Sequence, residues 1–323
     1  MSGNKKTLYI HIGTGKTGTS ALQKFLVFNE NILYENHDIK YLITGRDQNK
    51  HRALDLNARR HDTDGLSKVK KLLIEVNKEI LESKATRFLI SDEDFPGLTK
   101  NEIQLYREMI DSRINIKVII YLRRQDEYLE SWYLQLVKTG QYNLDINSLK
   151  ERLLKKEVFE YSQILERWES VFGVNNLIIR IYQKTRFIDN DLFDDFMGIF
   201  NINSNKIKKE SKIVNSSLTR DKALLIKKIA NNNLAHILDD RLISYIKKLP
   251  SPQGDSKYTL NPTDREAFLN KFHTSNSIIS DKYFNGSPLF DYKIERDWQP
   301  RYAVPDILFI KTLEFIYNSQ TQS

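Results

Sequence analysis

A glycine-rich turn near the amino terminus constrains the fold of this chain more than any other feature. Residues 8–13 (LYIHIG) read as a short buried strand, and residues 19–28 place Leu22, Phe25 and Leu26 at helical spacing. The turn between them, residues 13–20, reads GTGKTGTS. Three glycines let the backbone approach a ligand, and the start of the following helix directs free amides at it. The turn therefore predicts an anion site at the end of the first strand.

Further strands and helices alternate along the first two thirds of the chain. The apolar patterns predict strands at residues 40–43, 87–91, 117–122 and 176–182, and helices at 66–83, 125–138 and 161–172. Beyond residue 191 the pattern is mainly helical, and residues 250–262 favour a loop. This alternation is typical of βαβ units and a parallel sheet, whose ligands bind at the carboxyl ends of the strands.

From these patterns we predict one α/β domain over residues 1–323. It has a P-loop-like three-layer fold, with a central parallel sheet flanked by helices in residues 1–200. Residues 201–323 form a mainly helical C-terminal extension of the same domain.

Composition excludes several classes of protein. The chain has no Cys, which excludes disulfides, thiolate zinc sites and a Cys nucleophile. No apolar run approaches the length of a membrane span, and the start, MSGNKK, lacks the apolar segment of a signal peptide. We therefore expect a cytoplasmic protein with no stable membrane insertion. The net charge of +8 is dispersed, which favours a small polyanionic ligand over nucleic acid.

The glycine-rich turn is not a Walker A loop. That motif, GxxxxGK[ST], has a glycine five residues before the glycine that precedes its lysine. Counting back from Gly15 reaches Ile10, inside the strand.

Instead, HIGTGKTGTSALQ, residues 11–23, resembles the 5′-phosphosulfate loop of sulfotransferases that use 3′-phosphoadenosine-5′-phosphosulfate (PAPS). The core KTGT followed by LQ is most like carbohydrate sulfotransferases and their bacterial relatives. The resemblance implies that Lys16 neutralises the leaving oxygen during sulfuryl transfer. It also implies a 5′-phosphosulfate site formed by Gly15, Lys16, Thr17, Gly18, Thr19 and Ser20.

A second segment, YLRRQDEYLESWY, resembles the 3′-phosphate motif of the same family. There Arg123 ends a strand, and Ser131 follows eight residues later on the next predicted helix. A guanidinium can donate two parallel hydrogen bonds to a phosphate, and a serine hydroxyl can add a further one. The resemblance implies that Arg123 and Ser131 hold the 3′-phosphate that distinguishes PAPS from ATP.

Sulfuryl transfer to a hydroxyl needs a general base, and the chain offers several candidates. Glu93, at the end of the strand 87–91, is the first choice, although it could equally cap the strand or pair structurally with Lys16. His51 is the second, although a histidine in a polar loop is commonly only solvated. Asp38 and Glu35, after the first helix, are the third.

The function that we expect is a bacterial-type, PAPS-dependent sulfotransferase. PAPS is its co-substrate, 3′-phosphoadenosine-5′-phosphate (PAP) its product, and no metal is required. The resemblance implies a hydroxyl of a carbohydrate or glycoconjugate as the acceptor; the oligomeric state stays open. One alternative is a P-loop-type nucleotide kinase or NTPase, with residues 92–94 as an acidic, metal-binding strand end. The other is a non-enzymatic binder of anionic glycan or nucleic acid.

Overall fold

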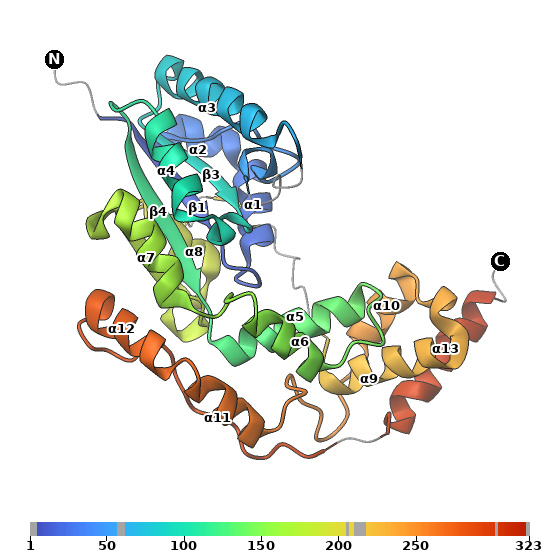
Figure 1. The fold of residues 1–323 in the computed structure, drawn as a ribbon. Coiled ribbons are helices and arrows are strands. Elements are labelled where there is room, and N and C mark those ends of the chain that lie inside the picture. The colour runs from blue at the N-terminus through green and yellow to red at the C-terminus, as the bar shows by residue number, and fades with distance from the viewer. Residues whose placement is uncertain (1–4, 57–61, 205–206, 210–217, 301–302, 321–323) are drawn as a thin grey trace. The chain divides into compact units, whose positions relative to one another are not determined.

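In the computed structural model, which describes residues 5–56, 62–204, 207–209, 218–300 and 303–320, the strands form one parallel sheet (Figure 1). Its strands are β1 (Thr7–Ile12), β2 (Ile39–Tyr41), β3 (Arg87–Asp92), β4 (Asn115–Leu122) and β5 (Leu177–Ile181). They lie in the order β2-β3-β1-β4-β5, with all pairs parallel. The predicted parallel sheet is thus confirmed.

The register of the sheet brings three strand ends together. Ile12 pairs with Asp92, and the Gly13 amide donates to the Asp92 carbonyl at 3.2 Å. On the other side of β1, the strand β4 runs on to Leu122 and Arg123. The segments that follow β1, β3 and β4 therefore lie side by side at the carboxyl edge of the sheet.

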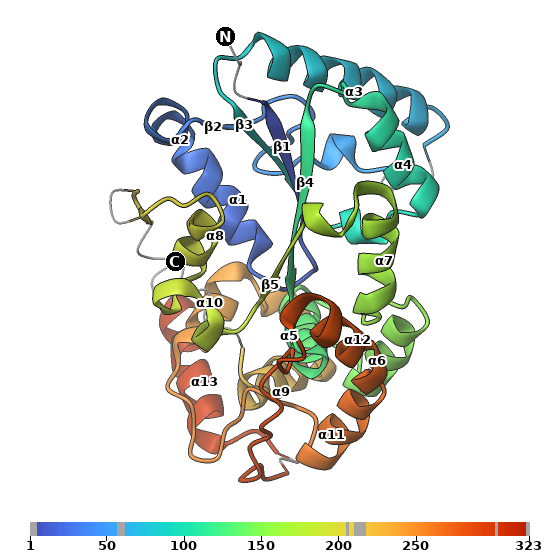
Figure 2. The same ribbon diagram turned by 90° about the vertical axis from the view of Figure 1, so that its left-hand side faces the viewer.

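Helices cover both faces of the sheet, as the two views show (Figures 1 and 2). On one face lie α1 (Thr19–Phe28), α2 (Glu30–His37) and α8 (Leu192–Gly198), and on the other α3 (Gly65–Glu82), α4 (Lys100–Met109) and α7 (Tyr161–Phe172). In β1, Leu8, Ile10 and Ile12 pack in the core with α3, α4 and α7. The central strands are apolar on both sides because both faces are covered. The fold is therefore the predicted three-layer α/β fold.

The chain divides into two compact units, and the boundary differs from the one that the sequence suggests at residue 200. The sheet unit comprises Met1–Arg123, Glu160–Ile213 and Ser275–Phe290. The helical unit comprises Arg124–Phe159, Val214–Thr274 and Asp291–Ser323. The segment after β4 thus leaves the sheet unit, although residues 1–200 were expected to form one α/β core.

The helical unit contains α5 (Gln125–Lys138), α6 (Ile146–Leu154), α9 (Arg220–Ile229), α10 (Asp240–Lys248), α11 (Pro262–Asn270) and α13 (Asp306–Gln320). Leu129 and Val137 of α5 share an apolar core with Leu225 and Ile226 of α9. Helix α12 (His273–Phe284) places Ile279 in the core of the sheet unit. None of the described helices is long and apolar enough to cross a membrane.

Candidate anion-binding site

The glycine-rich turn connects β1 to α1 at the carboxyl edge of the sheet. The carbonyl of Gly18 accepts the first helical bonds, from the amides of Ala21 and Leu22 at 2.9 and 3.0 Å. The amides of Gly18, Thr19 and Ser20 donate to no acceptor in the part of the chain that the structure describes. Such unbonded amides, with the positive end of the helix dipole, favour an anion at the start of α1.

Buried threonines hold this turn in place. The Thr14 hydroxyl donates to the Tyr121 carbonyl of β4 at 2.6 Å, and the Thr17 hydroxyl donates to the Thr14 carbonyl at 2.6 Å. Thr17 is fully buried, and its hydroxyl also lies 3.3 Å from that of Thr19. The Thr17 hydroxyl therefore stabilises the turn, where the sequence suggested a donor to the ligand. Ser20 is exposed.

Two residues of the turn adopt left-handed backbone angles. Gly18 has a φ of 74°, and a Cβ there would lie 2.4 Å from the Leu192 side chain; both facts favour glycine at this position. Lys16 has a φ of 66°, which is costly for a side chain with a Cβ and tends to occur at functional sites. Lys16 is half-buried and belongs to the same turn as the unbonded amides.

Arg123, the residue after β4, contacts the turn directly. Its Nη1 donates to the Lys16 carbonyl at 2.7 Å. Its guanidinium carbon lies 5.3 Å from the centre of the Tyr182 ring, within the range of a cation–π contact. The hydroxyl of Tyr161 donates to the Arg123 carbonyl at 2.7 Å and fixes the backbone there. The structure thus brings the predicted Arg123 and Lys16 together at one site.

Ser131 lies on α5, half-buried, and belongs to the helical unit. Its hydroxyl bonds to none of the residues that the structure describes. That Ser131 joins Arg123 at a 3′-phosphate stays a prediction.

Glu93 follows β3 directly and forms an ion pair. Lys50 Nζ lies 3.0 Å from Glu93 Oε1, and each side chain is about one third exposed. Being partly exposed, the Glu93 carboxylate is accessible at the same sheet edge as the turn. The sequence suggested Lys16 as a structural partner of Glu93, but the structure pairs Glu93 with Lys50.

His51 is fully buried and makes hydrogen bonds through both ring nitrogens. Nε2 lies 2.9 Å from the Leu42 carbonyl, and Nδ1 accepts from the Ser91 amide at 3.2 Å. This pattern requires the neutral ring with its proton on Nε2. Burial lowers the pKa of His51 to about 4. The solvated loop histidine that the sequence suggests is therefore absent, and the contacts give a base at His51 no support.

The third-choice bases lie elsewhere. The carboxylate of Asp38 accepts from the Thr86 amide and hydroxyl, just before the amino end of β3. Glu35 is exposed on α2, which ends at that side of the sheet. Since ligands of parallel sheets bind at the carboxyl edge, neither residue is placed for catalysis there.

Two buried groups beside the turn were not among the predicted sulfotransferase site residues, although Asp92 belongs to the acidic strand end of the kinase alternative. Asp92, at the end of β3, is fully buried, and its Oδ2 has no hydrogen-bond partner. Burial raises the pKa of Asp92 to about 7. His11 of β1 is also fully buried; its Nδ1 lies 2.9 Å from the Ser91 hydroxyl, and burial lowers its pKa to about 3. His11 is therefore neutral, and its buried Nε2 has no hydrogen-bond partner among the described residues.

Asp92 also belongs to a cluster of acids. Ligand oxygens of Asp55, Asp92 and Asp94 all lie within 4.8 Å of one another. Because Asp55 comes from the segment after β2, the sequence alone gave no compact set of metal ligands.

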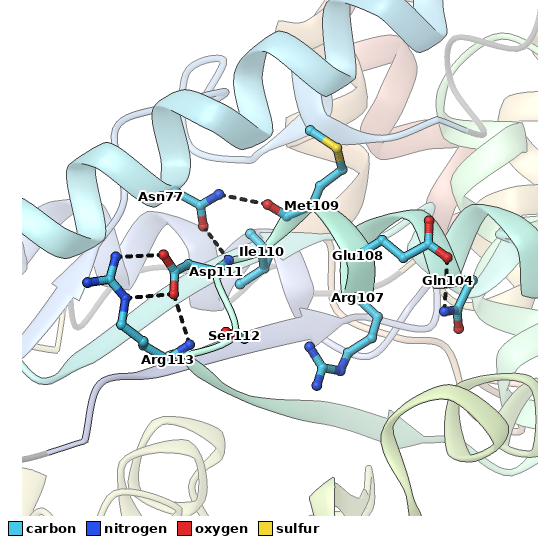
Figure 3. A pocket seen from close by; sticks show the side chains of 9 residues that line it. All are labelled: Asn77, Gln104, Arg107, Glu108, Met109, Ile110, Asp111, Ser112 and Arg113. Atoms are coloured by element: carbon cyan, nitrogen blue, oxygen red, sulfur yellow. Dashed lines mark hydrogen bonds and ion pairs between the residues drawn. The ribbon is translucent and has the colours of Figure 1, made fainter.

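A surface hollow lies at the opposite edge of the sheet (Figure 3). Asn77 of α3 donates to the Met109 carbonyl at 2.7 Å and accepts from the Asp111 amide at 2.9 Å. Asp111 and Arg113 pair with each other at 2.7 Å just before β4 begins. This hollow is near the amino end of β4, so it is separate from the anion-binding turn.

Comparisons with known proteins find only distant similarity to this chain. No family model matches the chain. An uncharacterised protein of Archaeoglobus fulgidus is 28% identical over 243 residues, which are 71% of this chain and 65% of that protein. The chain thus matches slightly less than two thirds of the length of that relative.

Solved structures show likeness at low sequence identity. A sulfotransferase from Alicyclobacillus acidocaldarius is 14% identical with a TM-score of 0.42, covering 76% of this chain and 97% of that one. A chain of the PezAT toxin–antitoxin system of Streptococcus pneumoniae is 13% identical with a TM-score of 0.29, covering 72% and 89%. The three-layer fold therefore rests on the sheet itself.

Proposed function

We propose that this protein transfers a sulfuryl group from PAPS to a hydroxyl of a carbohydrate or glycoconjugate. The observation that carries the proposal is the turn between β1 and α1, with its unbonded amides, its left-handed Lys16 and the bond from Arg123. The same residues carry the resemblance of segments 11–23 and 121–133 to the two PAPS motifs. The carbohydrate acceptor comes from that resemblance.

The roles of the residues follow from their places. The amides of Gly18, Thr19 and Ser20 would hold the 5′-phosphate, and the Lys16 ammonium would neutralise the bridging oxygen. In the transfer, the acceptor oxygen bonds to sulfur while the bond between sulfur and the bridging oxygen breaks. The negative charge then stays on PAP. Positioning and electrostatics of this kind supply most of the catalysis in the related phosphoryl transfers.

Glu93 is the base that we propose for the acceptor proton. It is partly exposed at the carboxyl edge of the sheet, and the ion pair with Lys50 at 3.0 Å holds its carboxylate there. His51 has no nitrogen available for this role, and Asp38 lies at the other edge.

Release of PAP from PAPS tests the proposal, with a mixture of oligosaccharides as acceptors. We expect acceptor-dependent PAP release by the full chain. Lys16→Ala should lower turnover by about 100-fold or more, as removal of one preorganised donor to a developing oxyanion does. Glu93→Gln should lower it by about 100-fold while PAP binding is retained. Arg113→Ala, on the opposite edge of the sheet, is the control and should keep full turnover.

Two outcomes would contradict the proposal. If Lys16→Ala retained turnover with its fold intact, the turn would not be the site. If the chain instead transferred or hydrolysed the γ-phosphate of ATP with Mg²⁺, it would be a kinase or NTPase.

A further inference from the structure

Helix α13 is apolar on two opposite faces. One face packs in the core of the helical unit, against α9 and α10, through Leu308, Phe315 and Ile316. The other, which we call the outer face, consists of exposed side chains three or four residues apart: Ile307, Ile310, Leu313 and Tyr317. No other helix in the described ranges exposes as many large apolar side chains. Because a helix that is apolar all round is normally buried, we expect a partner to cover the outer face.

The outer face is symmetric about the middle of the helix. Ile307 and Tyr317 lie five residues before and after Thr312, and Ile310 and Leu313 lie on either side of it. Two copies of α13, packed antiparallel around a two-fold axis beside Thr312, would place Ile307 of one copy against Tyr317 of the other. The same axis brings Ile310 close to Leu313 of the other copy. The outer face therefore complements itself, as a two-fold interface requires.

The charged residues beside the outer face favour the same arrangement. Lys311 and Glu314, three residues apart, flank the face on one side. They also lie on either side of Thr312, so the same axis puts Lys311 of one copy opposite Glu314 of the other. Neither side chain forms an ion pair with a residue that the structure describes. In a parallel pair these charges would instead meet the opposite flank, which carries Phe309.

The charges also argue against a membrane surface as the partner. Helices that lie on a bilayer carry lysines and arginines on their polar face, which attract anionic lipids. In α13 the acids Asp306 and Glu314 outnumber Lys311. A second copy of the helix fits this charge pattern better.

We propose that α13 forms a two-fold homodimer interface, in which the outer faces of two copies of this chain pack antiparallel around an axis beside Thr312. Ile310 and Leu313 lie at the centre of the interface, and Lys311 and Glu314 form ion pairs between the copies. The interface involves no nucleotide and no residue of the anion-binding turn, so it stands apart from the proposed sulfotransferase activity.

Sedimentation velocity of the full chain tests the interface. We expect a dimer of the 38.0 kDa chain at about 50 μM. Ile310→Glu puts a charge at the centre of the interface and should raise the dissociation constant about tenfold or more. Ile74→Glu is the matched control, because Ile74 on α3 is 56% exposed and Ile310 is 51% exposed. The control should leave the dimer unchanged.

Charge exchange makes the test independent of folding. Lys311→Glu and Glu314→Lys should each weaken the dimer, because each puts like charges opposite one another. The double variant restores opposite charges and should recover the dissociation constant of the wild type to within about twofold. A double variant that dimerised more weakly than both single variants would overturn the inference.

Disulfide cross-linking tests the direction of packing, because the chain has no cysteine of its own. On mild oxidation, a mixture of Ile307→Cys and Tyr317→Cys chains should form linked dimers, since an antiparallel pair puts these two positions opposite each other. Neither variant should link to itself, because its two thiols would lie about 15 Å apart along the helices, beyond the reach of a disulfide.

Three further results would overturn the inference. The first is a chain that stays monomeric at about 200 μM. The second is a dimer that Ile310→Glu weakens no more than Ile74→Glu does. The third is cross-linking of Ile307→Cys chains with one another, which a parallel pair would give. Binding of a monomeric wild type to vesicles of phosphatidylserine and phosphatidylcholine, lost in Ile310→Glu, would assign the outer face to a membrane surface instead.

Discussion

The guanidinium of Arg123 donates a hydrogen bond of 2.7 Å to the main-chain carbonyl of Lys16 and so ties the end of β4 to the turn after β1. Arg123 would thus have two roles: it would hold a phosphate, and it fixes the loop that receives the anion. A charged donor of this kind contributes roughly 1.5–3 kcal/mol.

Removal of this bond should loosen the turn before any ligand is added. In Arg123→Ala we expect the bonded amides that flank the turn, those of Gly13, Ala21 and Leu22, to exchange with deuterium about 10–100-fold faster than in the wild type. Hydrogen-exchange mass spectrometry measures this, with Arg113→Ala as the control. Unchanged exchange in the turn would show that Arg123 does not hold it.

Replacing Gly18 should be costly for two reasons. Its positive φ costs an alanine about 1–2 kcal/mol, and the added Cβ would also meet Leu192 at 2.4 Å. Gly286 is a matched control, since its φ is 76° and a Cβ there would have only an ordinary contact at 3.7 Å. In urea unfolding, Gly18→Ala should therefore lose clearly more stability than Gly286→Ala. Equal losses would mean that the turn relaxes around the added methyl group.

Glu130 should make the stability of the helical unit depend on pH. Burial raises the pKa of Glu130 to about 7, although the amides of Thr259 and Leu260 bond to it. The folded state keeps the proton where the unfolded state has lost it, so stability falls as pH rises from about 4.5 through 7. We expect a loss on the order of 1–3 kcal/mol over this range.

Glu130→Gln is the test of that dependence. A glutamine oxygen can accept both amide bonds, and its NH₂ group can donate to the Thr259 hydroxyl. The variant should be as stable as the wild type at pH 4.5 and more stable at pH 7. The free energy of unfolding of both proteins is measured by chemical unfolding at each pH. If it changed with pH in the same way in both, groups other than Glu130 would cause the dependence.

His51 should matter for stability and not for proton transfer. His51→Gln leaves the Leu42 carbonyl or the Ser91 amide without a well-placed partner, at a cost of about 1–3 kcal/mol. Below its unfolding temperature, the variant should release PAP with the pH profile of the wild type. If the variant's rate of PAP release no longer fell at one end of the pH range as it does in the wild type, His51 would be a catalytic base after all.

The sequence located most of the sheet because its strands are short apolar runs between turn signals. The predicted strand at residues 117–122 is β4 (Asn115–Leu122), and the predicted helix at residues 125–138 is α5. Helix α4 was missed, although Thr99 and Glu102 form a capping box that marks its start. The two compact units do not meet at residue 200 because α5 packs with distant helices such as α9, which no local pattern reveals.

The site was predictable where neighbours in sequence form it, and less so where the fold brings distant segments together. The turn at residues 13–20 was found from its glycines and its position after a strand. Asp55 comes close to Asp92 through the long connection after β2, which no local pattern in the sequence reveals. The burial of His51 likewise depends on contacts with Leu42 and Ser91, so its polar surroundings in the sequence were misleading.

The central claim is that the anion site recognises a nucleotide with a 3′-phosphate. Calorimetric titration with PAP and with ADP, which has as many phosphates but none at the 3′ position, tests it most directly. We predict that the wild type binds PAP at least tenfold more tightly than ADP. Arg123→Ala should abolish that preference, and Lys16→Ala should weaken both ligands. Equal binding of ADP and PAP by the wild type, or a preference that survives in Arg123→Ala, would contradict the account.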